Sequence, residues 1–219
     1  MGMIEFERPD GGICQGYLAG AGKGKPGVVV IQEWWGLNEQ IRSVADRLQA
    51  AGYNALVPDL FHGRVAGDAA EAGHLMDGLD FRSATFEDIR GAVRSLQKDS
   101  GKVAVLGFCM GGALAIASAV HLPEISAAIC FYGIPPAEFA DPAKISIPFQ
   151  GHFASRDAWI TPEKVNALEA AMKSAGNPPE IHRYEADHAF FNQMRPGVHD
   201  PESARLAWER SLLFLSGTL

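Results

Sequence analysis

The stretch Val103-Ala-Val-Leu-Gly-Phe-Cys-Met-Gly-Gly112 decides how this chain folds. It opens on a continuous apolar run, as in a strand buried on both faces of a parallel sheet. The Ala-rich run 113–120 that follows at once is typical of a helix. A single cysteine, Cys109, stands between the two, with Gly107 and Gly111 on either side. We therefore expect a strand, a sharp turn that carries a thiol, and a helix.

The pattern of this turn, G-x-C-x-G, indicates that its cysteine is a candidate nucleophile. This is the nucleophile-elbow form, with sulfur in place of the serine oxygen. Glycines are needed there because bulky neighbours would clash with the adjacent strand and helix. The helix N-terminus behind the turn favours a thiolate or a developing oxyanion. A lone cysteine is nevertheless more often an inert core thiol, so the rest of the chain has to decide.

Length and composition indicate one ordinary globular domain. The 219 residues are 47% hydrophobic and 21% charged, with a net charge of −7. We expect a single domain over residues 1–219, no nucleic-acid partner and no membrane association. The acidic N-terminus does not resemble a signal peptide, and three cysteines without metal-like spacing favour reduced thiols. These features predict a cytoplasmic protein.

Hydrophobic periodicity predicts alternating strands and helices after an opening hairpin. The hairpin comprises residues 3–8 and 13–19 around Pro9-Asp-Gly-Gly12. Further strands are expected at 28–31, 54–57, 103–106, 125–132, 147–153 and 180–184, and helices at 38–51, 85–98, from 161, and at 203–215. Residues 64–82 are expected to form a small helical excursion. The pattern predicts an α/β fold with a doubly wound, mostly parallel eight-stranded sheet flanked by helices.

Four chemically capable side chains follow strands of this predicted sheet. Glu33 follows the third strand, Cys109 the fifth, Asp157 the seventh and His188 the eighth. Groups at the carboxyl ends of parallel strands gather in one crevice. The chain order of nucleophile, acid and histidine is that of the α/β-hydrolase fold. His188 would take the proton of Cys109, and Asp157 would orient the imidazole.

Two backbone N–H groups are the expected oxyanion hole of this site. One belongs to Met110, the residue directly after the nucleophile, and the other to Trp34, in the loop after the third strand. No group of His, Cys and Asp has the spacing of metal ligands, so we expect no metal and no cofactor.

Other acids and histidines leave alternatives open. Asp59 also ends a strand, and Asp187 is adjacent to His188, although that position gives poor geometry for pairing. Asp157 could instead cap the helix that begins near residue 161. Among the other histidines, His152 and His182 are expected to be structural, whereas His62 and His74 could line a pocket.

Four motifs together resemble the dienelactone hydrolase family. They are Gln32-Glu-Trp-Trp-Gly-Leu-Asn38, Pro58-Asp-Leu-Phe-His-Gly63, Gly107-Phe-Cys-Met-Gly-Gly112 and Asp187-His-Ala-Phe-Phe191. The likeness runs from about residue 10 to the C-terminus. It implies an α/β-hydrolase fold with a Cys-His-Asp triad that hydrolyses a lactone or ester through an acyl-cysteine. It also implies that Glu33 interacts with the resting thiol and assists its deprotonation when substrate arrives.

The chain departs from this family where the substrate carboxylate is held by arginines. One of those arginines stands four residues after the catalytic histidine, where this sequence has Asn192. Arg195 is nearby but displaced, and Arg64 and Arg82 only flank the 64–82 excursion. Trp34, Trp35, Phe190 and Phe191, with Asn192, are the expected pocket residues.

These residues favour a small-molecule ester or lactone as the partner, with the chain a monomer or a weak homo-oligomer. Two other functions stay open. One is a thioester or apolar-ester hydrolase of different specificity, and the other is a non-catalytic ligand-binding protein of the same fold.

Overall fold

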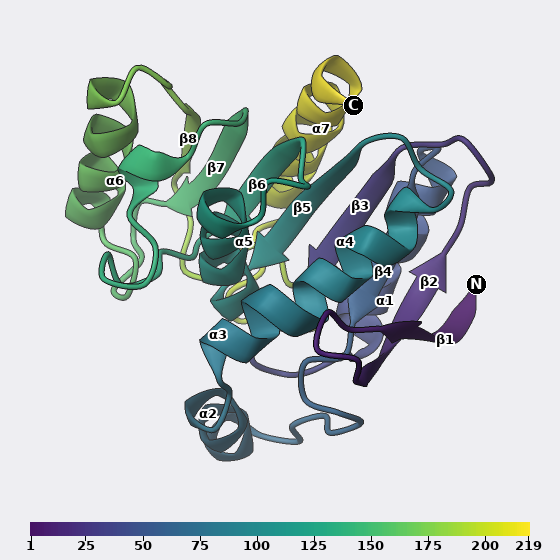
Figure 1. Cartoon of the computed structure of the whole chain (residues 1–219). Coiled ribbons are helices and arrows are strands. Elements are labelled where there is room, and N and C mark those ends of the chain that lie inside the picture. Colours follow the sequence, from purple (N-terminus) through teal and green to yellow (C-terminus); the bar gives the residue numbers. More distant parts are fainter.

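One eight-stranded sheet with helices on both faces forms the body of the molecule (Figure 1). The computed structural model describes all residues, 1–219. The strands are β1 Gly2–Glu7, β2 Ile13–Ala19, β3 Gly27–Ile31, β4 Asn54–Pro58, β5 Val103–Phe108, β6 Ala127–Phe131, β7 Phe149–Ala154 and β8 Glu180–Tyr184. The helices are α1 Glu39–Ala50, α2 Ala69–Asp77, α3 Phe81–Ser83, α4 Arg90–Gln97, α5 Met110–His121, α6 Pro162–Ser174 and α7 Pro201–Thr218. The predicted fold class is thereby confirmed.

The strand order creates a crevice at the middle of the sheet. The order is β1-β2-β4-β3-β5-β6-β7-β8, and β2 alone runs against its neighbours. From β3 the chain goes outward to β4, and from β4 it crosses back to β5 on the other side of β3. Connections that leave in opposite directions open a crevice beyond the strand ends. The ends of β3 and β5, which precede Glu33 and Cys109, therefore lie at this switch point.

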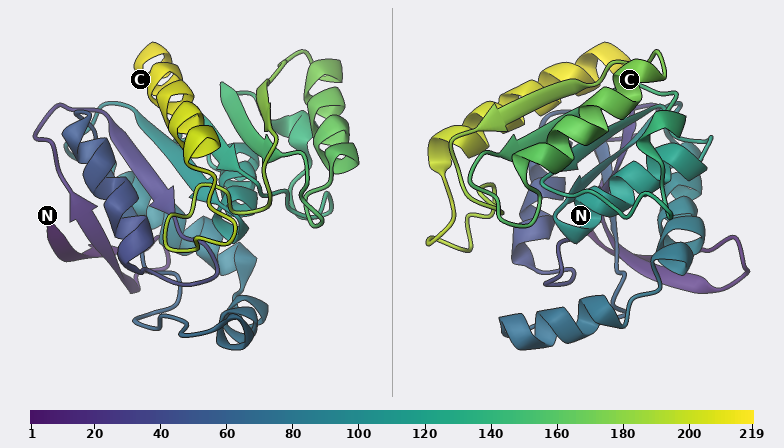
Figure 2. Two further views of the ribbon diagram at one scale, coloured as in Figure 1. Left: turned by 180° about the vertical axis from the view of Figure 1, so that it is seen from behind. Right: turned by 90° about the vertical axis from the view of Figure 1, so that its left-hand side faces the viewer.

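Each face of the sheet has its own apolar core. Helices α4, α5 and α6 cover one face, and α1 and α7 cover the other (Figure 2). Along β5, Val103 and Val105 contribute to the first core and Ala104 and Leu106 to the second, and all four are fully buried. Burial on both faces explains why this strand is apolar without interruption.

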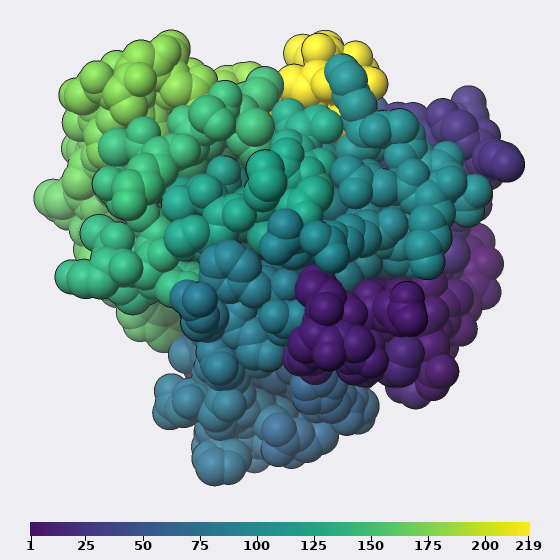
Figure 3. All heavy atoms as spheres, in the orientation of Figure 1, coloured from purple at the N-terminus to yellow at the C-terminus, as the bar shows by residue number.

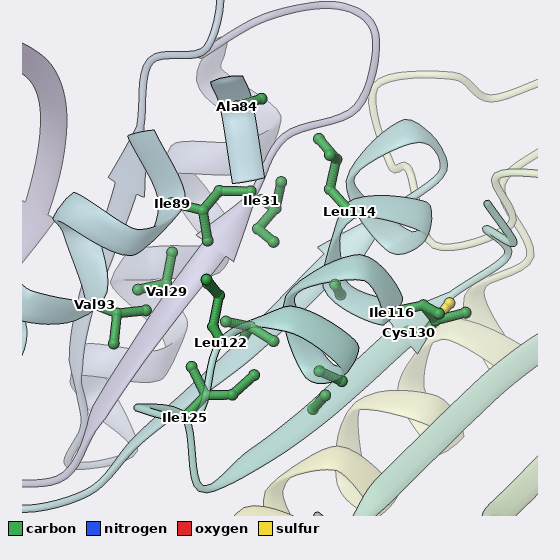
Figure 4. Close-up of a cluster of buried hydrophobic side chains, with 14 of the residues drawn as sticks. Val29, Ile31, Ala84, Ile89, Val93, Leu114, Ile116, Leu122, Ile125 and Cys130 are labelled. Atoms are coloured by element: carbon green, nitrogen blue, oxygen red, sulfur yellow. The ribbon is translucent and has the colours of Figure 1, made fainter. Parts of the chain in front are cut away.

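The α4–α5 side of the sheet is packed by branched aliphatic side chains. Val29 of β3, Val93 of α4 and Leu114 of α5 converge there (Figure 4). Complete burial of one such side chain stabilises the fold by about 1.5–3 kcal/mol. This packing fixes α5, and with it the turn that carries Cys109, against the sheet.

The helix predicted at 85–98 begins earlier than its periodicity indicates. A carboxylate oxygen of Asp80 accepts hydrogen bonds from the N–H groups of Arg82 and Ser83, which starts α3. A π-helical turn, Ala84–Ile89, then joins α3 to α4. The apolar pattern missed this start because the residues that cap the helix are polar and precede the periodic run.

The predicted excursion contains α2, which lies beyond the strand ends (Figure 1) and stands out as a lobe in the space-filling view (Figure 3). Its N-cap, Asp68, accepts a hydrogen bond from the N–H of Glu71. Ala72 and Leu75 are its buried residues. None of the helices of the chain combines the length and the apolarity needed to cross a bilayer.

Candidate active site

Cys109 sits on a strained turn between β5 and α5. Its φ of 54° and ψ of −116° are unusual for a residue with a side chain and cost about 1 kcal/mol or more. A Cβ on Gly107 would overlap the Gly111 carbonyl, and one on Gly111 would overlap the carbonyls of Ile31 and Gln32. Both glycines are therefore required by the close approach of α5 to β3 and β5.

The structure brings Cys109, His188 and Asp157 together from three strand ends. His188 Nε2 lies 3.2 Å from Cys109 Sγ, and His188 Nδ1 lies 2.6 Å from Asp157 Oδ2. The Asp157 side chain is fully buried, whereas the imidazole is 15% exposed. The imidazole can therefore exchange a proton with the thiol while Asp157 fixes its orientation.

Asp157 also holds the loop that follows β7. Its other carboxylate oxygen accepts hydrogen bonds from the N–H groups of Trp159, at 2.8 Å, and Ile160, at 2.9 Å. Burial opposes ionisation, but the hydrogen bond and charge of His188 and these N–H groups outweigh it. The pKa of Asp157 consequently lies below its ordinary value. The local loop role and the pairing with histidine, which the sequence left as alternatives, coexist.

The two carboxylates that the sequence offered as alternatives to Asp157 have other partners. Asp59 accepts hydrogen bonds from the N–H groups of Phe61 and Gly63 and so shapes the turn after β4. Asp187 is exposed and pairs with Arg156 at 3.1 Å. Neither carboxylate is hydrogen-bonded to His188.

His152 lies inside the sheet, where it satisfies both ring nitrogens. Nδ1 is 2.8 Å from the hydroxyl of Tyr184, and Nε2 is 2.9 Å from Oε1 of Gln150. Burial, together with the nearby His182 and Arg210, holds the pKa of His152 well below its usual value. His152 is thus a structural residue, as expected.

Glu33 carries a buried carboxylate. The hydroxyl of Tyr132 donates to Oε1 at 3.2 Å, and the amide of Asn192 donates to Oε2. No hydrogen bond joins Glu33 to the sulfur of Cys109. Burial raises the pKa of Glu33, against the opposing effect of these two donors and of the His188 charge.

The environment of Cys109 disfavours the thiolate. Burial and the negative charge of Glu33 raise the pKa of the thiol to about 12, although the N–H of Met110 acts in the opposite direction. The N–H of Met110, directly after the nucleophile, is one of the two expected oxyanion donors. The N–H of Trp34 makes no hydrogen bond within the chain, which leaves it available to a ligand.

A cavity of about 400 Å³ opens over the sulfur. Ten of its thirteen lining residues are hydrophobic, and no Lys, Arg, Asp or Glu is among them. The lining consists of Trp34, Met76, Phe81, Cys109, Met110, Ala113, Tyr132, Gly133, Ile134, Pro136, Trp159, Ile160 and His188. The cavity is therefore suited to a neutral, apolar ligand.

The expected pocket residues other than Trp34 do not line this cavity. Phe190 and Phe191 are at most 2% exposed and pack in the core beneath α7. Trp35 faces Arg195, whose guanidinium lies 5.2 Å from its ring, and Asn192 binds Glu33. Adjacency in the chain misled the prediction, because the chain turns sharply after Glu33 and after His188. His62 and His74 are likewise absent from the lining.

Sequence reasoning missed Tyr132 and Trp159. The ring of Tyr132 lies 5.1 Å from that of His188, and the ring of Trp159 lies 4.8 Å from it. Tyr132 directly follows β6, so its place at a strand end was the available signal. Three of the four non-glycine residues with positive φ, Cys109, Tyr132 and Ala189, belong to this region. Such strain concentrates at functional sites.

No group of three or more His, Cys, Asp or Glu side chains in the chain is placed to hold a metal ion. The chemistry that these residues can perform is proton transfer and attack by sulfur.

Comparison with known proteins adds family evidence. The family model described as "Dienelactone hydrolase family" matches residues 14–219. "Protein usf" of Aquifex pyrophilus is 33% identical over 97% of this chain and 96% of its own length. A protein of Aquifex aeolicus named "Putative carboxymethylenebutenolidase" is 31% identical, with the same shares covered.

A solved structure agrees on the fold. It is a dienelactone-hydrolase-like promiscuous phosphotriesterase from metagenomic libraries, with a TM-score of 0.83 and 24% identity. The alignment covers 98% of this chain and 97% of the other. At this identity the likeness supports the architecture of the chain and nothing finer.

Proposed function

The chain belongs to the dienelactone hydrolase family, and on that premise we propose that it hydrolyses carboxylic esters or lactones through an acyl-cysteine on Cys109. The observation that carries the proposal is the continuous hydrogen-bonded path from Asp157 through His188 to Sγ of Cys109. It ends in a cavity large enough for a small ester.

Acylation begins when His188 Nε2 takes the thiol proton and the sulfur attacks the substrate carbonyl carbon. The C–S bond forms while the carbonyl π electrons move onto oxygen, and the N–H groups of Met110 and Trp34 bind that oxyanion. Collapse breaks the C–O bond of the ester, and His188 gives its proton to the leaving oxygen. Asp157 stabilises the imidazolium throughout.

Deacylation repeats these steps with water. His188 takes a proton from water as the hydroxyl oxygen attacks the acyl-cysteine, and the same N–H groups bind the second oxyanion. The C–S bond then breaks, the sulfur regains its proton, and the carboxylic acid leaves. In a lactone the leaving oxygen stays attached to the acyl group, so the product is a single hydroxy acid.

Glu33 acts on the nucleophile through its charge. With Tyr132 and Asn192 holding the carboxylate, its negative charge keeps Cys109 as a thiol until a substrate is present. Since the thiolate is the form that oxidants attack, the resting protein is protected.

The test compares hydrolysis of p-nitrophenyl acetate and dienelactone by the wild type and Cys109→Ala. The matched control is Cys14→Ala, which removes a second buried thiol in β2, away from the site. We expect Cys109→Ala to lose the rate and Cys14→Ala to keep it. Mass spectrometry of rapidly quenched wild type should detect one acyl group on Cys109. An active Cys109→Ala variant would contradict the proposal, and a wild type inactive on both substrates would contradict the ester and lactone assignment.

A further inference from the structure

The cavity over Cys109 has two ends made by different elements. Trp34, Trp159 and His188, from the loops after β3, β7 and β8, gather at one end, because the ring of Trp159 lies 6.0 Å from that of Trp34 and 4.8 Å from that of His188. Ile160 follows Trp159 and belongs to the same lining. The other end is formed by α2, α3, the first turn of α5 and the loop after β6, through Met76, Phe81, Ala113, Ile134 and Pro136.

The position of the imidazole distinguishes these two ends chemically. His188 has to protonate the leaving oxygen, so the alcohol part of the ester lies at the end that contains the imidazole. The carbonyl oxygen is directed to the N–H groups of Met110 and Trp34. The acyl chain therefore extends in the opposite direction, away from His188.

We propose that the end formed by Met76, Phe81, Ala113, Ile134 and Pro136 is an acyl subsite for a neutral, apolar chain. Ala113 sets the depth of this subsite. The inference rests on the proposed function and adds to it the class of acyl group and the residue that selects it.

Ala113 is placed to act in this way because it lies one helical turn after the nucleophile. Its N–H donates to the carbonyl of Cys109 at 3.1 Å, and both residues line the cavity. Ala113 is 7% exposed and is one of the residues that line the cavity. A larger side chain there would extend into the space that the acyl chain needs.

The distal end of the subsite is apolar and partly open. Met76 comes from α2 and Phe81 from α3, at the start of the helix that continues into α4. Phe81 packs edge-on against Phe139 at 6.5 Å. Methylenes placed between these side chains leave water. Each buried methylene should raise kcat/KM about fourfold.

The experiment measures kcat/KM for p-nitrophenyl acetate, butyrate, hexanoate and decanoate with wild type and Ala113→Leu. We expect the wild-type value to rise from acetate to hexanoate, and Ala113→Leu to lower the hexanoate-to-acetate ratio by at least about tenfold, the effect of losing about two methylene contacts. The matched control is Ala175→Leu at the exposed end of α6, which should keep the wild-type ratio.

A second substrate series tests the orientation. With acetyl esters of methanol, butanol and hexanol, Ala113→Leu should leave the dependence on alcohol length unchanged. Should Ala113→Leu fail to fold, Phe81→Ala replaces it and is expected to raise the decanoate-to-butyrate ratio by about fourfold or more.

Three results would overturn the subsite. They are an unchanged acyl-length ratio in the folded Ala113→Leu variant, an unchanged decanoate-to-butyrate ratio in Phe81→Ala, and a change that follows the alcohol series instead. A wild type that hydrolyses none of these esters, or a Cys109→Ala variant that still does, would instead contradict the proposed function.

Discussion

The raised pKa of Cys109 leads to a prediction that distinguishes a resting thiol from a resting thiolate paired with imidazolium. A pKa of about 12 leaves a thiolate fraction near 10⁻⁴ at pH 8, whereas an ordinary cysteine of pKa ~8.5 is about one quarter ionised. The intrinsic reactivity of a thiolate rises with its pKa, with a slope of about 0.4–0.5. The two effects together predict that Cys109 reacts with a small disulfide roughly 30- to 100-fold more slowly than a free thiol.

The assay is reaction with 4,4′-dithiodipyridine from pH 6 to 11, with the labelled peptide identified by mass spectrometry. Since burial and the Glu33 charge raise the pKa, the thiol is the form present below it. The logarithm of the rate should therefore rise with a slope near one across pH 7 to 10. A plateau between pH 6 and 8 would refute the reasoning, because it would show a thiolate paired with imidazolium already at rest.

Glu33→Gln tests the cause of the raised pKa. Removing a nearby charge lowers a raised pKa by about 1 or more, so the thiolate fraction of Cys109 at pH 8 should rise about tenfold. Because the intrinsic reactivity of the thiolate falls as its pKa falls, labelling at pH 8 should increase about three- to fourfold. The matched control is Asp187→Asn, an exposed carboxylate beside His188, which should change the rate by less than about twofold. Equal rates in Glu33→Gln and wild type would assign the raised pKa to burial alone.

Four further predictions concern the triad, the buried histidine, the elbow and the cavity. Asp157→Asn should lower kcat by roughly 10³–10⁴ with a near-wild-type circular dichroism spectrum, because the imidazole of His188 loses its preferred tautomer; a loss below tenfold would contradict this. The pKa of His152 lies well below its usual value, so the unfolded chain binds the extra proton as the pH falls below ~6.5. Through His152, the free energy of unfolding should fall by up to about 1.6 kcal/mol between pH 6.5 and 5 in denaturant titrations, and His152→Phe should show a correspondingly flatter pH dependence. Gly111→Ala should destabilise the fold by more than about 3 kcal/mol in urea titrations, because its methyl group would overlap the Ile31 carbonyl; a stable variant would contradict the close approach. Mono-p-nitrophenyl succinate should be hydrolysed at least about tenfold more slowly than the butyrate, because no cation lines the cavity to receive its carboxylate; equal rates would contradict a neutral-substrate cavity.

The sequence by itself determined the architecture, because the architecture depends on local periodicity. The continuous apolar run before Gly107 and the Ala-rich run after Cys109 specify a strand and a helix without any distant contact. The same logic predicted that Cys109, Asp157 and His188 would meet. Parallel strands place their carboxyl ends at one edge, whatever the details of packing.

Only the tertiary structure decided what surrounds these groups. Glu33 receives its donors from Tyr132 after β6 and from Asn192 after β8, and no local pattern connects these residues. The cavity likewise takes Ala113 and Trp159 from elements far apart in the chain, while Phe190 and Phe191, adjacent to the site in sequence, turn into the core. Spacing along the chain encodes periodic structure. The sharp turns after the strands and the packing of distant loops set the direction of each side chain, and through it the charge and shape of the site.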